Sequence, residues 1–100
     1  MDDGMISIAT DFSRSPAGRF ISDGPASGER FRRDFLIPGL QRHDRLVVDL
    51  DGTRGIGSSF LEEAFGGLVR LGFSASELMR KFVFKTKDPS LESEIRSYWK

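Results

Sequence analysis

The sequence predicts a single α/β domain in which helices pack on a small mixed β-sheet. Two observations lead to this prediction. Short apolar runs that are typical of strands alternate along the chain with longer segments in which apolar residues recur at helical spacing. A chain of 100 residues is also the size of one domain, which we expect to occupy residues 1–100 with a core in about 5–100.

The first third of the chain predicts a strand, a loop and a helix. Residues 5–9 alternate apolar and small side chains with β-branched content, which favours a strand. Residues 13–28 are dense in Ser, Pro and Gly and predict a loop. Within that loop, residues 19–21 are expected to form a short strand in a hairpin with the first. Ser27 then starts a helix as its N-cap, and Pro38 is expected to end or kink it.

The middle of the chain contains the clearest strand and the clearest helix. Residues 45–50 form a nearly continuous apolar run, typical of a central strand buried on both faces. A glycine-rich loop follows. Ser59 and Glu62 have the spacing of a capping box, and a wide apolar face then predicts a helix over 59–71. Gly72 is expected to end this helix.

The remaining segments complete a β(β)αβα(α)βα order of elements. Residues 76–81 predict a short helix, residues 82–86 a strand, and residues 90–99 a final helix. Pro89 precedes that helix, at a position where a helix start tolerates proline.

Composition excludes several classes of function. The 15 basic and 15 acidic side chains cancel, so the broad attraction that nonspecific nucleic-acid or anionic-membrane binding relies on is missing. No apolar run approaches the length of a membrane span, and the N-terminus lacks the basic residues of a signal peptide. The chain has no cysteine, which excludes disulfides and thiolate metal sites. We therefore expect a cytoplasmic protein that binds neither nucleic acid nor membrane.

Two stretches together resemble a known family. Residues 24–32 (GPASGERFR) and residues 49–68, which run from DLDG to GSSFLEEAFGGL, are similar to the bacterial STAS-like domains of unknown function. The wider STAS group is named for sulfate transporters and anti-sigma factor antagonists. The resemblance covers roughly residues 5–100 and implies a STAS-like fold with a non-enzymatic, protein-binding regulatory role in bacterial signalling. It also implies a protein partner, such as a histidine-kinase-like ATPase or a regulator.

The resemblance points to one serine in particular. In the antagonists of this group, a serine at the start of a helix is phosphorylated by a partner kinase, and phosphorylation switches protein binding. Ser58 is the matching position, followed by Ser59. Gly57 stands where the antagonists usually carry aspartate, and Phe60 where they carry glycine.

The residues themselves allow two interpretations of this serine pair. If Ser59 is the N-cap, its hydroxyl accepts a backbone hydrogen bond and Ser58 is left free for modification or binding. Alternatively, both serines are structural helix-entry residues. A phosphate here would meet favourable helix-start amides but also two nearby glutamates. The order of elements brings Ser27 and Gly28 to the same end of the sheet as Ser58. The candidate partner-binding or phosphorylation site is therefore Ser58, Ser59, Ser27, Gly28 and Gly57, with Arg19 and Arg32 as rim charges.

A phosphohydrolase is the alternative function. Residues 47–53 match the hhDxDGT pattern of haloacid-dehalogenase-like phosphatases, in which Asp49 would attack phosphorus and Asp51 would act as acid and base, with both helping to bind magnesium. That fold normally needs more chain after the motif, together with a further acidic pair. The single histidine, His43, permits neither a histidine metal cluster nor a Ser-His triad. We therefore expect no catalytic residues, no metal and no cofactor.

Overall fold

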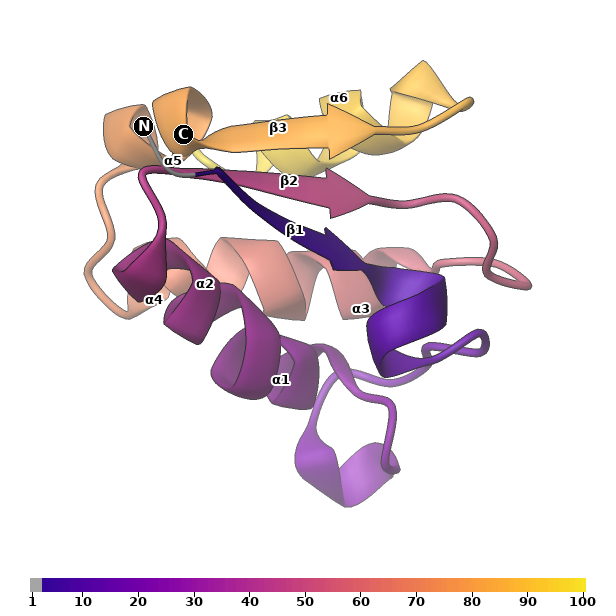
Figure 1. Cartoon of the computed structure of the whole chain (residues 1–100). Helices are drawn as coiled ribbons and strands as arrows, with labels where there is room; N and C mark the ends of the chain where they lie inside the picture. The colour runs from indigo at the N-terminus through magenta and orange to yellow at the C-terminus, as the bar shows by residue number, and fades with distance from the viewer. Residues whose placement is uncertain (1–2) are drawn as a thin grey trace.

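A computed structural model describes residues 3–100 and shows a three-stranded sheet with helices packed on it (Figure 1). The strands are β1 (Asp3–Ser7), β2 (Arg45–Asp49) and β3 (Phe82–Lys85), in the spatial order β1-β2-β3. The predicted α/β fold class is confirmed. Both strand pairs are parallel, so the described sheet has no antiparallel pairing of the kind a mixed sheet would contain.

The N-terminal segment differs from the prediction. The first strand runs over residues 3–7 rather than 5–9, because Ile8–Phe12 turns into a π-helical segment, η1, whose N-cap Ser7 accepts a hydrogen bond from the Thr10 amide. The prediction that residues 19–21 form a strand in a hairpin is wrong. Ile21–Asp23 instead forms a 3₁₀ turn, η2, in which the Asp23 carboxylate accepts bonds from two preceding backbone amides. A side chain that satisfies these amides removes the need for a strand partner.

The first long helix continues through the proline that was expected to end or kink it. It consists of α1 (Gly28–Phe31), a π-helical segment η3 (Arg32–Leu36) and α2 (Ile37–Arg42). The Ile37 amide bonds to the Arg32 carbonyl five residues back, which defines the wider π turn. Pro38 comes directly after this turn, and π turns are one recognised way in which helices accommodate a break in the regular hydrogen-bond ladder.

A second long helix follows β2 and its glycine-rich loop. It consists of α3 (Ser58–Leu61), a π-helical segment η4 (Glu62–Gly66) and α4 (Gly67–Arg70). The chain leaves it at Gly72, whose φ of 104° suits glycine, as predicted. Two further helices were also predicted correctly within one or two residues: α5 (Ala75–Lys81) and α6 (Pro89–Ser97).

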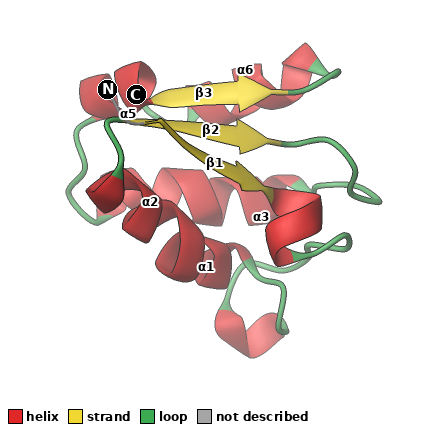
Figure 2. Cartoon of the chain, in the orientation of Figure 1, coloured by secondary structure: helices red, strands yellow, loops and turns green. Residues whose placement is uncertain are grey.

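The core lies on one side of the sheet. Ile6, Leu46, Val48 and Phe82 point toward the helices and are buried, whereas their strand neighbours are exposed or half-buried. The expectation that the central strand is buried on both faces is therefore wrong. In Figure 2 the helices formed by residues 3–100 lie behind or beside the three strands, and none of them covers the face of the sheet that is turned to the viewer. None of the helices described is long and apolar enough to cross a lipid bilayer.

Candidate functional site at the start of α3

The start of α3 presents two serines at the surface. Gly57 is the N-cap, with φ −81° and ψ 158°, so Ser58 and Ser59 occupy the first two helical positions and are both exposed. The prediction that Ser59 caps this helix is wrong, because the N-cap is Gly57, two residues before the cap that the sequence pattern indicates. A residue inside the first turn has helical backbone angles, and its side chain cannot take the capping position.

Ser58 is the more constrained of the two serines. Its side chain faces the Tyr98 phenol, at the end of α6, and acts to lower the pKa of that phenol. The Tyr98 hydroxyl in turn donates to a carboxylate oxygen of Glu94. Burial, followed by this hydrogen bond to Glu94, raises the pKa of Tyr98 to about 12. Ser58, whose hydroxyl was expected to be free, therefore has this phenol as a neighbour, and Ser59 is the less restrained group.

The start of α1 lies beside α3, but its residues are buried rather than exposed. Ser27 is fully buried and caps α1 as predicted, accepting a hydrogen bond from the Arg30 amide at 3.2 Å. The amides of Gly28 and Glu29 donate to carbonyls of residues 18 and 19 at 3.0 Å. A Cβ at Gly28 would lie only 2.5 Å from the Phe60 carbonyl oxygen, so the two helices touch backbone to backbone here. Ser27 and Gly28 therefore join the helices and offer no surface to a partner.

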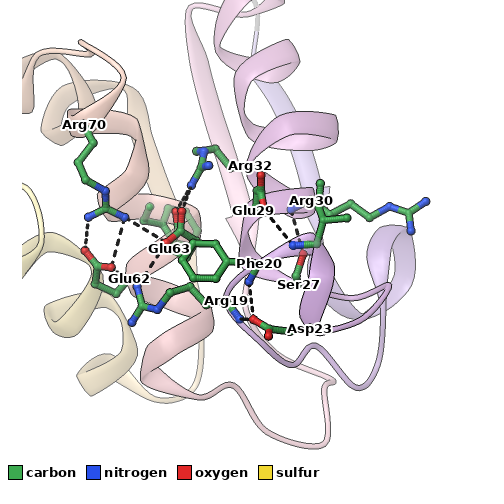
Figure 3. A network of polar contacts seen from close by, with 12 residues as sticks. Arg19, Phe20, Asp23, Ser27, Glu29, Arg30, Arg32, Glu62, Glu63 and Arg70 are labelled. Carbon is green, nitrogen blue, oxygen red and sulfur yellow. Dashed lines mark hydrogen bonds and ion pairs between the residues drawn. The ribbon is translucent and has the colours of Figure 1, made fainter.

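The two arginines predicted as rim charges are the centre of an ion-pair cluster (Figure 3). Arg19 Nη1 lies 2.5 Å from Glu62 Oε1 and 3.4 Å from Glu63 Oε1. Arg32 Nη1 lies 3.0 Å from Glu63 Oε2. Arg70 completes the cluster, with Nη1 2.5 Å from Glu62 Oε2. The sequence interpretation missed Arg70, although its position two helical turns after Glu62 places both on one face of the same helix.

The cluster changes the electrostatics of the serine pair. Three guanidinium groups face two carboxylates, which leaves one net positive charge. The hydrogen bond from Arg70, assisted by that from Arg19, lowers the pKa of Glu62 against the opposing effect of burial. Glu62 and Glu63 lie about one turn after Ser59, so the repulsion expected from these two glutamates toward a phosphate is compensated.

The aspartates of the phosphatase-like motif hold a turn together. Asp49 ends β2, and its Oδ1 accepts a hydrogen bond from the Asp51 amide at 2.9 Å. Asp51 accepts from the Thr86 hydroxyl and the Lys87 amide, each at 3.1 Å, and so ties this turn to the end of β3. Within residues 3–100, no group of three or more His, Cys, Asp or Glu side chains could hold a metal ion. Through these contacts, both aspartates stabilise the turn that follows β2.

Fold and site together define a small α/β domain whose distinctive surface is a serine pair at the start of a helix, beside an arginine-rich cluster. Residues 27–92 match the family model of the STAS-like domain of unknown function (DUF4325), and the chain belongs to this family. The match runs from the N-cap of α1 into α6 and includes the whole serine segment. Searches of curated proteins and of solved structures gave no significant match.

Proposed function

We propose that this domain is a non-enzymatic regulatory module that binds another protein through the start of α3. The observation that supports this proposal best is the exposure of two adjacent serines on a rigid helix start, one turn from a cluster with net positive charge. Exposed polar groups that a fixed scaffold holds in place are typical of binding sites. Membership of the STAS-like family is consistent with a role of this kind.

A serine phosphoswitch is the finer part of the proposal. Phosphorylation adds close to two negative charges at neutral pH, and helix starts and arginines both favour such a group. Ser59 is the better acceptor, because the Ser58 side chain faces the Tyr98 phenol, whose hydroxyl donates to the Glu94 carboxylate. A bacterial histidine-kinase-like ATPase or a related regulator is the kind of protein that we propose as the partner.

Binding measurements with matched serine variants test the proposal. Wild-type protein is used to capture its partner from the native host, and the captured protein is then titrated calorimetrically against Ser58→Glu, Ser59→Asp and Ser93→Asp. Ser93 is an exposed helical serine on α6, flanked by two glutamates, and serves as the control. We expect both α3 variants to weaken binding at least about tenfold, or 1.4 kcal/mol, with the control unchanged. Equal affinities for all three variants would place the interface elsewhere.

Mass spectrometry of the protein isolated from its host tests the phosphoswitch separately. Trypsin cuts after Arg54 and Arg70, so both serines fall in one peptide, residues 55–70. Fragmentation between Ser58 and Ser59 then assigns the phosphate to one of them. A partner that binds in the calorimetric test, with no phosphate found on this peptide under any growth condition, would support the binding role and reject the switch.

A further inference from the structure

The outer edge of β1 carries backbone groups that no strand of residues 3–100 pairs with. β1 is at one end of the strand order, so only one of its sides is bonded to β2 (Figure 1). The Ser7 amide donates to Asp11 Oδ2 at 2.8 Å, and it therefore points away from β2. Backbone groups alternate in direction along a strand, so the amide and carbonyl of Met5 point to the same outer side. Met5 is 63% exposed, which leaves this edge accessible.

Two hollows follow this edge and form one groove beside the first long helix. Their volumes are about 270 Å³ and about 430 Å³, and Asp34 and Phe35 line both of them, which makes them continuous. Apolar side chains line both hollows: Ile6, Pro38 and Leu46 in the first, Phe12 and Pro25 in the second. We call the two hollows together the β1 groove. It offers two apolar sites side by side, next to an open strand edge.

The charges along the β1 groove differ between its ends. Asp34 lies in the middle, and its carboxylate oxygens are 3.5 Å from Arg30 Nε and 2.8 Å from Arg33 Nε. Arg42 lines the first hollow at the end of α2, where it is exposed and forms no ion pair within residues 3–100. Asp11 lines the second hollow, and its carboxylate already accepts a backbone amide. A ligand in the first hollow would therefore meet a cation that is free to pair with an acidic group.

We propose that the β1 groove binds an extended segment of a partner protein, which adds as a further strand beside β1. In strand addition, main-chain hydrogen bonds provide affinity and pockets for alternate side chains provide specificity. The unpaired edge selects an extended backbone as the occupant, because only a strand matches the spacing of its amides and carbonyls.

The groove also defines the side chains of this segment. Alternate residues of a strand share a face, so two apolar residues separated by one residue would fill the two hollows. An acidic residue beside them would pair with Arg42. The groove contains none of the residues of the serine site, so this binding goes beyond the proposed function.

Selection from a random peptide display library tests the predicted segment. We expect the enriched peptides to share two apolar residues separated by one residue, with an acidic residue next to them. The most enriched peptide is then synthesised and titrated calorimetrically. Arg42→Glu should weaken its binding at least about tenfold. Arg80→Glu is the control, because Arg80 is exposed on α5 and lines neither hollow. A library that enriches no such pattern, or equal affinities for the two variants, would overturn the proposal.

Two variants of one residue test the main-chain bonds. Met5→Pro removes the outward amide, which an edge position tolerates, and should weaken peptide binding at least about tenfold. Met5→Ala keeps the amide and should bind like the wild type. Hydrogen exchange gives a second measurement on the unmodified protein: the peptide should slow exchange of the Met5 amide, whereas the Ile6 amide, which points toward β2, should change little.

The remaining outcomes of these experiments would each contradict strand addition. Full peptide binding by a folded Met5→Pro would do so, with folding checked by thermal melts. If Met5→Pro does not fold, hydrogen exchange decides, and an unchanged rate at the Met5 amide overturns the proposal. Sedimentation velocity up to about 1 mM tests a second copy of the chain as the occupant. Self-association that Met5→Pro abolishes would assign the edge to that copy and reject the peptide.

Discussion

The guanidinium group of Arg32 lies 3.0 Å from the Glu63 carboxylate and also donates to the backbone carbonyl of the same residue. The side chains of Arg32 and Glu63 are only 12% and 10% exposed. This pair joins the first long helix to the second in a place that water hardly reaches. Removing one partner would leave the other charge poorly solvated, which is the costly way to break an ion pair.

We therefore expect Arg32→Ala to lower the free energy of unfolding by about 2–3 kcal/mol, somewhat below the cost of breaking a fully buried pair. Arg33→Ala is the control. Arg33 is 59% exposed and pairs with Asp34 at the surface, so its loss should cost much less than the loss of Arg32. Urea melts of both variants measure the difference. Equal losses would mean that the Arg32–Glu63 contact contributes no more than a surface pair.

Two glycines of the predicted site, Gly28 and Gly57, should differ in how strongly replacement by alanine changes stability. A Cβ at Gly28 would meet the Phe60 carbonyl oxygen at 2.5 Å, and backbone cannot move aside cheaply. Gly28→Ala should therefore destabilise the protein by about 2 kcal/mol or more, as overpacking does. Gly57 has open space around it and φ −81°, so Gly57→Ala should change stability by less than about 1 kcal/mol. Thermal melts of the pair check this, and a stable Gly28→Ala would refute the backbone-to-backbone contact.

Local patterns in the sequence located most elements, because strands and caps depend on neighbouring residues. The apolar run of β2 and the N-cap at Ser27 are examples. The N-cap of α3 was missed, because Ser59 and Glu62 have the capping-box spacing, whereas the actual cap, Gly57, has no side chain that a sequence pattern could identify. The pairing of Arg19 with Glu62 could not be predicted, because 43 residues separate them and only the packing of the loop that contains Arg19 against the second long helix brings them together. The site therefore depends on contacts that local patterns do not contain.

Ser27, which caps α1, and Ser59, which does not cap α3, should differ in their contribution to stability. Ser27 accepts a backbone bond from Arg30 and is fully buried, so Ser27→Ala should cost about 1–2 kcal/mol. Ser59 lies exposed inside the first turn of α3, and Ser59→Ala should fall within about 0.5 kcal/mol of wild type. Chemical denaturation distinguishes these values. A loss of 1 kcal/mol or more at Ser59 would restore that residue as the cap of α3.

The phosphatase alternative predicts turnover, whereas our proposal predicts none. With magnesium and a generic aryl phosphate, we expect hydrolysis at the background rate and no difference between wild type and Asp49→Asn. The physical reason is that the Asp51 carboxylate, which would have to act as acid and base, already accepts hydrogen bonds from Thr86 and Lys87 that stabilise the turn. Activity that disappears in Asp49→Asn would establish Asp49 as a nucleophile and make the domain an enzyme.

The hydroxyl of Tyr98 offers a spectroscopic test of the contact between α6 and α3. The chain contains one tyrosine, so the ultraviolet absorbance of phenolate formation reports on this residue alone. We expect a pKa of about 12, raised from 10.0 first by burial and then by the hydrogen bond to Glu94. Glu94→Gln removes the carboxylate charge and should lower this pKa toward 10. Glu92→Gln is the control, because Glu92 pairs with Arg96.

The same shift predicts how stability depends on pH. Folding favours the protonated phenol, so its contribution to stability is fully present below pH 10, the pKa of the unfolded state. The contribution is lost as pH rises from 10 to about 12, because the unfolded chain releases the proton first. Unfolding free energies of wild type and Tyr98→Phe, measured across this interval, should therefore converge as pH rises. A difference between the two proteins that does not change with pH would mean that the phenol ionises equally easily in both states, and that the folded protein neither buries it nor bonds it to Glu94.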